Sequence, residues 1–423
     1  MVEFRCALVL SCLFLALTTP VHATECECGD TLTTDTILTA DLLDCPEHGL
    51  TLDADGITLD GNGYRISGAG IGVGIKINGR DGVVVKNCEI SDFEDGIKIR
   101  PGSERDSIGS NTIRDNTRYG IYSAGLWEST NGHSVISGNN IIDNDDSGIH
   151  FTYTHDDTIF DNVIMGNTEK GICIDGQQQT SRNSYNQVLG NEITGSNYGV
   201  YIGWAYGYQY VIGNTITDNS YGISIWSTGF WTTFSGNTIH RNALHGISAV
   251  GCFLLVMEDN DVQHNGQGFY VRGSGLSASS ESRLVSNTIR NNVNNGIYLD
   301  RQSGDWELMD LAITGNDISD NLGYGLYVGS AGVTSDSIYG NEFAANVLGN
   351  AYEVTGVTGN MWHTDSTGNL WDDWVLNPGY PEGIYYVDGP GDGIDSLPGR
   401  TAGVPYSEEP APATWGGIKS LFR

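Results

Sequence analysis

The sequence predicts an all-β fold: a single right-handed parallel β-helix, which is a solenoid of roughly a dozen coils. A motif reading Asn-Thr-Ile-x-x-Asn-x-x-x-Gly-Ile-x-Ile recurs along most of the chain, for example at 111–123, 214–225 and 287–299. Repeats of this size are typical of solenoids, in which each repeat packs only against its neighbours. Within a repeat, short β-branched runs alternate between apolar and polar residues, which indicates strands rather than helices. The right-handed sense follows the general preference of parallel connections.

Two columns of Asn and one column of Gly run through the repeats. Asn111 and Asn214 belong to the first Asn column, and Asn116 and Asn219 stand five residues later in the second. Stacked in register, such amides can bond to those above and below them and form a ladder. Asn also tolerates the left-handed backbone that tight turns need. We expect the Gly column to mark another turn of each coil, with Asn350 in that place in the last repeat.

The chain divides into five segments in order. Residues 1–23 have the short apolar core and the small-residue cleavage site of a secretory signal peptide, and are too short to span a membrane. Residues 24–60 are expected to cap the first coil, and residues 61–370 form the repeats. Residues 371–398, rich in Trp, Asp and Gly, are expected to close the last coil. Residues 399–423 are expected to be a linker and tail.

Charge and cysteine content limit the partners of the protein. With 20 basic and 52 acidic residues the net charge is −32, which disfavours nucleic acid and anionic lipid as partners. An anionic polymer would therefore need local basic residues or bridging calcium, which is the one cofactor considered; no clustered metal ligands are predicted. Export permits disulfides, so Cys45 could pair with Cys26 or Cys28. The sequence does not predict an oligomeric state.

Three segments carry a resemblance to known proteins: Cys28-Gly29-Asp30-Thr31, the Gly-Ile-Thr-Leu-Asp-Gly-Asn-Gly run at 56–63, and the closing segment at 371–395. Together with the repeats, they resemble secreted parallel β-helix proteins of the NosD and pectate-lyase-like superfamily. The resemblance implies the β-helix fold and a secreted, periplasmic or cell-surface location. That superfamily includes polysaccharide lyases, hydrolases, C5-epimerases, copper-site assembly factors and surface proteins, so the fold leaves the activity open.

Aromatic residues recur at outward positions of the strand that follows the Gly column, and in the insertions after it. Flat aromatic faces suit the apolar C–H faces of sugar rings, although tyrosines can also simply stack along a sheet. The insertions also carry Trp127, Tyr206, Phe230 and Trp306. The candidate substrate-binding residues are Tyr201, Trp204, Trp226, Tyr270, Tyr298 and Tyr327.

Ionisable residues at outward positions of adjacent coils suggest chemistry on uronate sugars. Elimination or epimerisation needs a cation for the carboxylate, a base for the C5 proton and an acid on the other side. His155 and Asp156 share two positions with the Asp-Pro-His-Asp motif of mannuronan C5-epimerases. A glycosidase would instead need paired carboxylates, for which Asp156, Asp157 and Asp175 are candidates. The candidate catalytic residues are Lys98, Arg100, Tyr122, His150, His155, Asp156 and Asp175.

The sequence therefore predicts an exported protein that binds or modifies an extracellular polysaccharide, with uronate lysis or C5 epimerisation as the candidate reactions. Two alternatives remain open at this point. One is a non-catalytic, carbohydrate-binding solenoid of the cell surface. The other is a NosD-like accessory protein for a copper cluster, which the small number of Met residues, five in all, disfavours.

Overall fold

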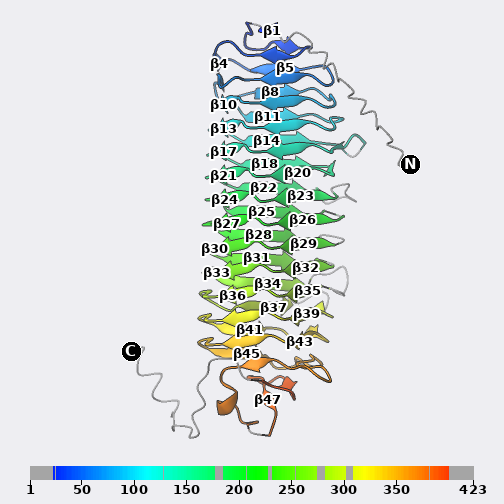
Figure 1. Cartoon of the computed structure of the whole chain (residues 1–423), viewed down its shortest axis with the longest axis vertical. Coiled ribbons are helices and arrows are strands. Elements are labelled where there is room, and N and C mark those ends of the chain that lie inside the picture. The colour runs from blue at the N-terminus through cyan, green and yellow to red at the C-terminus, as the bar shows by residue number, and fades with distance from the viewer. Residues whose placement is uncertain are drawn as a thin grey trace, which may run out of the picture.

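The chain winds into a tall stack of coils, each with three short strands (Figure 1). Equivalent strands of successive coils pair in parallel, so the stack has three long sheets of fourteen strands each among the described residues. This confirms the predicted parallel β-helix. The computed structural model describes residues 22–23, 25–126, 128–176, 184–205, 207–226, 231–252, 254–273, 282–301, 308–380 and 382–399.

The first sheet contains β1 (His22–Ala23), β3 (Thr36–Ile37), β6 (Thr58–Asp60), β9 (Val84–Lys86), β12 (Ser107–Gly109), β16 (Val135–Ser137), β20 (Thr158–Phe160), β23 (Asn186–Leu189), β26 (Gln209–Ile212), β29 (Thr232–Ser235), β32 (Leu255–Glu258), β35 (Arg283–Val285), β39 (Ala312–Thr314) and β43 (Ser337–Tyr339). The second sheet contains β4 (Leu42–Cys45), β7 (Arg65–Gly68), β10 (Glu89–Ser91), β13 (Thr112–Arg114), β17 (Asn140–Ile142), β21 (Val163–Met165), β24 (Glu192–Thr194), β27 (Thr215–Thr217), β30 (Thr238–His240), β33 (Asp261–Gln263), β36 (Thr288–Arg290), β40 (Asp317–Ser319), β44 (Glu342–Ala344) and β46 (Leu370–Trp371).

The third sheet contains β2 (Thr31–Leu32), β5 (Leu50–Leu52), β8 (Val73–Ile77), β11 (Asp95–Ile99), β14 (Tyr119–Ala124), β18 (Ser147–Thr152), β22 (Lys170–Asp175), β25 (Tyr198–Gly203), β28 (Tyr221–Trp226), β31 (His245–Val250), β34 (Gln267–Gly273), β37 (Ile297–Arg301), β41 (Tyr324–Val328) and β45 (Gly349–Glu353). Three small pairs complete the described strands: β15 (Asn131–Gly132) with β19 (Thr154–His155), β38 (Leu308–Met309) with β42 (Val333–Thr334), and β47 (Tyr385–Tyr386) with β48 (Ile394–Asp395). One 3-10 turn, η1, spans Trp374–Leu376.

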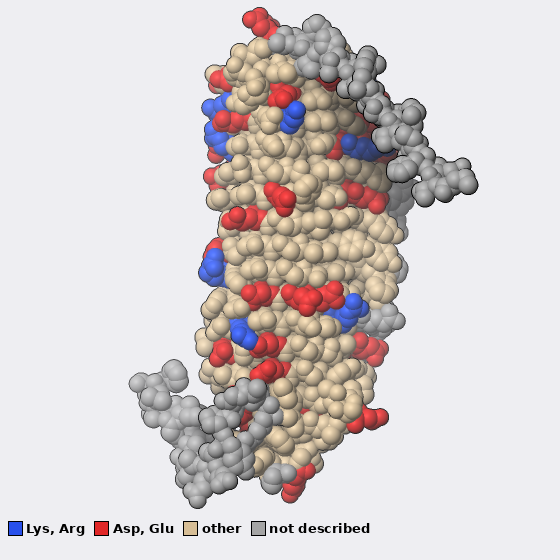
Figure 2. Space-filling model, in the orientation of Figure 1, with Lys and Arg blue, Asp and Glu red and all other residues tan. Residues whose placement is uncertain are grey.

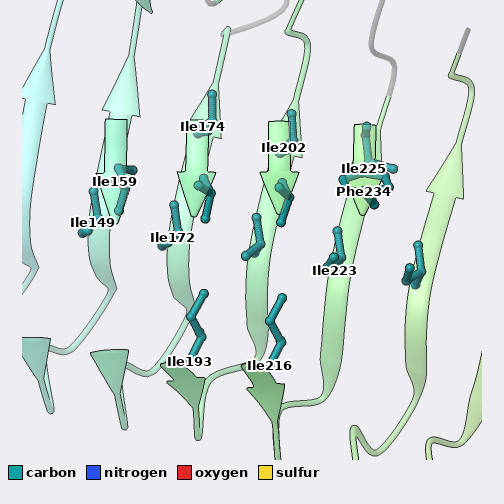
Figure 3. Close-up of a cluster of buried hydrophobic side chains, with 14 of the residues drawn as sticks. Ile149, Ile159, Ile172, Ile174, Ile193, Ile202, Ile216, Ile223, Ile225 and Phe234 are labelled. Carbon is teal, nitrogen blue, oxygen red and sulfur yellow. The ribbon is translucent and has the colours of Figure 1, made fainter. Parts of the chain in front are cut away.

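The core is built from columns of β-branched side chains that repeat from coil to coil. Ile193 and Ile216 lie opposite each other on β24 and β27, and both are fully buried. Figure 3 shows how Ile174, Ile202 and Ile225 line up in the same way on neighbouring strands of the third sheet. Because every strand places alternate residues inward, the period-two pattern of the sequence becomes one continuous apolar core.

The predicted Asn ladder is present, but its backbone conformation differs from the prediction. Asn191, Asn214 and Asn237 are buried. Asn191 donates its side-chain N–H to the amide oxygen of Asn214, and Asn214 donates in the same way to Asn237, both at 3.0 Å. Each ladder amide oxygen also accepts the backbone N–H of the preceding ladder Asn. The left-handed residue is not the Asn but the one before it, such as Asp161 or Gly213. The ladder therefore selects Asn for its hydrogen bonds, and the turn is made one residue earlier.

The prediction that the Gly column marks a turn is wrong. Gly120 and Gly222 lie within strands β14 and β28 and have no left-handed backbone. A Cβ atom added at Gly222 would lie 2.5 Å from the carbonyl oxygen of Gly246 and 2.7 Å from the Ile239 side chain. The column is glycine because successive coils approach closely there. Asn350 likewise has no left-handed backbone, whereas Gly349 before it has a φ of 142°.

Both ends of the solenoid are covered. Near the first coil, Cys28 and Cys45 form a disulfide, one of the two predicted pairings. At the other end, Trp371 stacks between Phe343 and Tyr385, with ring centroids 4.6 and 3.9 Å apart. Trp362, also fully buried, packs beside Trp371. These large side chains seal the apolar core that the last coil would otherwise expose.

Two predicted segments fall largely outside the described residues: the signal peptide, apart from His22–Ala23, and the tail from 400 onward. Strands β2 to β6, within residues 25–60, already belong to the three sheets. Where the structure describes the chain, it contains no helix with the length and apolarity that crossing a membrane requires.

Candidate functional site

The outer face of the third sheet brings the predicted side-chain columns into register. Lys98 pairs with Tyr122, Tyr122 with His150, and Tyr270 with Tyr298 along neighbouring strands. Tyr298 pairs in turn with Tyr327. The face has two regions: a polar region on β11, β14, β18 and β22, and an aromatic region that begins at β25.

Aromatic rings form a continuous series over seven successive strands of this face. Centroids of neighbouring rings are 4.8, 5.3, 5.1, 5.5, 5.2 and 5.4 Å apart along the series. At about 4.8 Å per strand, the six steps extend over roughly 29 Å. We call this series the aromatic ridge: Tyr198, Tyr221, His245, Tyr270, Tyr298, Tyr327 and Tyr352.

A shallow groove with a volume of about 510 Å³ runs beside the C-terminal half of the aromatic ridge. Tyr270, Tyr298, Tyr324 and Tyr327 contribute to its lining. Its other side is lined by exposed aliphatic residues of the turns that precede the strands: Leu244, Val293, Leu322 and Leu348, each 47–58% exposed. A repeated exposed aliphatic position of this kind is unusual, because soluble proteins rarely keep contiguous apolar surface without a binding role.

Burial keeps His245 and Tyr270 of the ridge uncharged. It lowers the pKa of His245 to about 4, so this imidazole is uncharged at neutral pH. It also raises the pKa of Tyr270 to about 12, with a further contribution from the Asp300 carboxylate. The Tyr270 hydroxyl donates a hydrogen bond to Asp300 at 3.1 Å.

The polar region places three of the predicted catalytic residues together. Lys98 lies over the ring of Tyr122 at 4.9 Å from its centroid, and the Tyr122 and His150 rings are 5.6 Å apart. Tyr119 contacts both of these rings, and Arg118 stacks over Tyr119 at 4.3 Å. We call this group the polar cluster: Lys98, Arg118, Tyr119, Tyr122 and His150.

Within the polar cluster, ionisation is set by burial and by local ion pairs. Lys98 pairs with the buried carboxylate of Asp95 at 2.8 Å. Burial lowers the pKa of His150 to about 4, helped by the positive charge of Lys170. Its Nδ1 atom is buried without a hydrogen-bond partner. His150 is thus a neutral imidazole at pH 7, and too weak a base to be well matched to proton abstraction there.

The remaining predicted catalytic residues are placed elsewhere. Arg100 is exposed and follows the end of β11. Asp175 lies at the end of β22, three strands from Lys98 and therefore roughly 14 Å away along the stack. It is close enough to Tyr201 to raise the pKa of that phenol, which burial chiefly drives to about 12.

His155 and Asp156 do not join the polar cluster. They lie at β19 and just after it, on the connection from the third sheet to the first. Asp157, a glycosidase candidate, is fully buried, and one of its carboxylate oxygens accepts the backbone N–H of Ser134 at 2.8 Å. A catalytic role for Asp157 on the surface is therefore wrong.

The predicted aromatic residues divide into two groups. Tyr270, Tyr298 and Tyr327 belong to the aromatic ridge, and Tyr201 joins it through a ring contact with Tyr198 at 5.6 Å. Trp204 and Trp226 form a separate pair with centroids 6.5 Å apart, and Trp226 is 52% exposed. Trp127, Tyr206, Phe230 and Trp306 lie outside the described residues.

Sequence reasoning missed four of the seven ridge residues: Tyr198, Tyr221, His245 and Tyr352. The residue before the Gly column also points outward, and it is aromatic at Tyr119, Tyr198, Tyr221, His245 and Tyr324. This column was visible in the sequence, but the outward positions were counted only from the Gly onward. The aliphatic residues that line the groove stand two or three residues before the Gly column, and they were missed for the same reason.

Charged groups are unevenly distributed on the surface. On the side shown in Figure 2, acidic side chains are spread along the whole solenoid and basic ones are fewer. Many of the basic ones are paired, such as Arg241 with Asp218 at 2.7 Å. Lys98 and Arg118 of the polar cluster are paired as well, with Asp95 at 2.8 Å and with Glu94 at 3.1 Å.

Comparisons with known proteins agree with this fold. The crystal structure of the periplasmic alginate epimerase AlgG matches with a TM-score of 0.53 at 15% identity, covering 74% of this chain and 77% of that one. The A-module of an Azotobacter vinelandii mannuronan C-5 epimerase matches with a TM-score of 0.40 at 14% identity, covering 79% and 89%. At 15% identity the likeness to AlgG concerns the fold alone. No curated protein sequence matches significantly.

A match to a family model shows which family the chain belongs to. The model described as periplasmic copper-binding protein (NosD) matches residues 55–247 and 184–375, two overlapping ranges that together cover most of the 423 residues. These ranges contain the aromatic ridge, the polar cluster and nearly all of the regular coils. The protein belongs to the NosD family.

Proposed function

We propose that the protein binds an extracellular polysaccharide along the aromatic ridge and its adjoining groove. The observation that carries this proposal is the unbroken series of seven aromatic rings at intervals of 4.8–5.5 Å. A polymer laid along the solenoid axis would meet one aromatic side chain per coil, so many weak contacts would add up. The similarity in fold to an alginate epimerase is consistent with a sugar polymer as the ligand.

The chemistry of the ridge favours stacking over charge recognition. His245 and Tyr270 of the ridge are neutral at pH 7, and the protein as a whole carries a charge of −32. An anionic polymer would be repelled by this charge, except where calcium bridges carboxylates on both sides. We therefore propose a neutral or weakly charged polymer for the ridge. Calcium would matter only for an anionic one.

Binding can be tested by substituting ridge residues. Tyr298→Ala and Tyr270→Ala should each weaken binding to a polysaccharide found on a glycan array by about 2- to 10-fold, because one stacking contact is worth ~0.5–1.5 kcal/mol. Trp226→Ala and Tyr201→Ala should weaken it too if the polymer continues along the face beyond Tyr198. Isothermal titration calorimetry with and without calcium provides the measurement.

Tyr210→Ala is the matched control, since Tyr210 is a half-buried outward Tyr on β26 of the first sheet. It should leave affinity unchanged. An array on which no polymer binds, or a Tyr298→Ala protein that binds as tightly as the parent, would overturn the proposal.

A second candidate function is elimination or epimerisation of uronate residues at the polar cluster. The observation that favours it is the contact of two cations, Lys98 and Arg118, with the phenol rings of Tyr119 and Tyr122. In this role a cation would hold the sugar carboxylate and a Tyr would exchange the C5 proton. The weak basicity of His150 favours Tyr122 over His150 as the proton-transfer group.

Uronate polymers incubated with the protein would test this second function. Elimination yields an unsaturated product that absorbs in the ultraviolet, and epimerisation exchanges the C5 hydrogen with solvent deuterium. If either occurs, Tyr122→Phe should abolish turnover while binding at the ridge survives, because only the transferable proton is lost. Activity retained in Tyr122→Phe would contradict this assignment.

Because the family is described as copper-binding, copper is a candidate ligand for this chain. Soft sulfur donors do not gather into a site: among the described residues, none of the cysteines Cys26, Cys88, Cys173 and Cys252 belongs to a cluster of three potential ligands, and Cys28 and Cys45 form a disulfide. Imidazole and carboxylate donors do fit copper in its divalent state. Among the described residues, one group of at least three potential ligands lies close enough to share an ion: His133, His155 and Asp156.

A further inference from the structure

We propose that His133, His155 and Asp156 form a surface site for a divalent transition-metal ion, with Cu²⁺ or Zn²⁺ as the ions that fit best. The site lies on the connection from the third sheet to the first, apart from the polar cluster and the aromatic ridge. It does not depend on polysaccharide binding, and it gives specific residues to the copper alternative. His155 and Asp156 thereby acquire a role other than the epimerase chemistry expected from the sequence.

Parallel pairing of two successive coils holds the ligands together. Strands β15 and β19 form an additional two-stranded sheet, in which Gly132 lies opposite His155. The backbone N–H of His133 donates to the carbonyl oxygen of His155 at 3.0 Å. The two histidines, 22 positions apart in the sequence, are thereby fixed on neighbouring coils.

Glycine at position 132 makes room for the His155 ring. A Cβ atom added at Gly132 would lie 2.6–2.7 Å from ring atoms of His155, a distance at which the imidazole would have to move. The ring of His155 therefore packs directly against the backbone of Gly132. It meets the ring of His133 edge-on, with centroids 5.2 Å apart and planes at 86°.

The donor atoms lie at distances that an ion could bridge. His155 Nδ1 and Asp156 Oδ2 are 3.0 Å apart, and the ligand atoms of all three residues lie within 4.8 Å of one another. Metal–ligand bonds of 2.0–2.1 Å in a tetrahedral site place neighbouring ligand atoms roughly 3.3 Å apart. Side-chain rotation at exposed His133 would be enough to bring the third ligand in.

Two imidazole nitrogens and one carboxylate oxygen select among cations. Zn²⁺ and Cu²⁺ accept this mixture, whereas Ca²⁺ and Mg²⁺ prefer all-oxygen sites. Three protein ligands also leave at least one coordination position open. Such a site could hold an ion while a partner or a solvent molecule completes its coordination.

The electrostatic surroundings permit a cation. Arg105 occupies the position equivalent to His133 one coil earlier, but its guanidinium pairs with Asp81 at 2.8 Å and with Glu104 at 2.9 Å. Its charge is therefore compensated by two carboxylates. With an overall charge of −32, the protein attracts divalent cations in general.

Metal titration of the tag-free, full-length protein tests the site. Calorimetry with ZnCl₂, and electron paramagnetic resonance with one equivalent of Cu²⁺, should show a single high-affinity site with nitrogen ligation. The melting temperature should rise with metal concentration, because only the folded state brings the three ligands together. His155→Ala and His133→Ala should each lower the affinity more than about tenfold, and Asp156→Asn should lower it less.

The chain offers a matched control in His240 and Asp261. Their Nε2–Oδ2 distance is 3.0 Å, and their exposures, 22% and 40%, are close to the 24% and 42% of His155 and Asp156. No third ligand accompanies them in the described chain, so His240→Ala should leave metal affinity unchanged. Circular dichroism would verify that each variant keeps the parent's fold. The proposal would be overturned if His155→Ala still bound one equivalent of metal, or if His240→Ala lost as much affinity as His155→Ala. A parent protein that binds no metal would overturn it too.

Discussion

Buried carboxyl groups take the place of amides at three points of the turn between the third and first sheets. One carboxylate oxygen of Asp106, of Asp157 and of Asp336 accepts a backbone N–H of the preceding coil, at 2.8–2.9 Å. Burial raises the pKa of Asp106 to about 8 and that of Asp157 to about 7. These side chains are therefore largely protonated in the folded protein at mildly acidic pH, where an unfolded chain would ionise them.

The titration of Asp106 predicts a pH-dependent stability. Between pH 4 and 8 the folded state binds a proton that the unfolded state has released, so the free energy of unfolding falls as pH rises. Asp106→Asn keeps the acceptor for the Val83 N–H and cannot ionise. The variant should match the parent near pH 4 and exceed its stability at pH 8 by at least about 1 kcal/mol. Urea denaturation at both pH values measures this difference.

Asp218→Asn is a suitable control for that experiment. Asp218 lies on the surface, and its hydrogen bond to Arg241 lowers its pKa. Its replacement should not stabilise the protein at pH 8. If Asp106→Asn shows the same pH dependence as the parent, the buried carboxyl is already ionised in the folded state.

At the residue scale, the sequence predicted the residues whose hydrogen bonds repeat from coil to coil. It did not predict the effects of burial or of contacts between insertions of neighbouring coils. The Asn columns were recognisable because their hydrogen bonds repeat with the coil. The protonation of Asp106 was not, since it depends on burial that no local pattern reports. The proximity of His133 to His155 was also hidden, because insertions of unequal length follow the third-sheet strands.

At the scale of the strand, stability depends on two kinds of buried column. Ile216 on β27 is fully buried between Ile193 and Ile239. Two residues earlier, Asn214 donates to the carbonyl oxygens of Val188 and Ile212 as well as to the next ladder amide. One column excludes water, and the other satisfies the backbone of the turns.

These two columns should respond differently to substitution. Ile216→Asp buries an unpaired carboxylate and should cost several kcal/mol, which unfolds the neighbouring coils. Asn214→Ala leaves turn groups unsatisfied and should cost less, about 1–3 kcal/mol. Ile216→Val, as a control, should cost only about 0.5–1.5 kcal/mol. Thermal melting of the three variants gives the order, and an Ile216→Asp protein that melts like the parent would refute the inward placement.

The strands themselves were predictable because inward positions recur at fixed offsets from the Asn and the Gly. The outer face was only partly predictable. Tyr298 and Tyr327 were recognised after the Gly, whereas Tyr221 and His245 before it were not. An outward side chain is constrained by function rather than by packing, so its column is interrupted and harder to recognise.

At the scale of the whole molecule, a solenoid must protect both of its ends. Each coil pairs only with its neighbours, so the last coil would present an open core and three unpaired strand edges. The segment after β45 covers this end with Trp362, Trp371 and Tyr385. Its composition indicated a closing role, but not which ring would sit at the centre.

Trp371 is the central residue of this closure, and its loss should open the end of the solenoid. Its ring is fully buried between Phe343 and Tyr385, and its indole N–H donates to Asp395 at 2.9 Å. Trp371→Ala should cost about 3–5 kcal/mol locally and free the Asp395 carboxylate from one donor. The exposed strand edges should then pair with other molecules, which analytical ultracentrifugation would detect as concentration-dependent association.

Trp226→Ala removes the same side chain from an exposed site and should leave the protein's melting temperature and association state unchanged. If Trp371→Ala melts and sediments like Trp226→Ala, the closing segment does not protect the last coil.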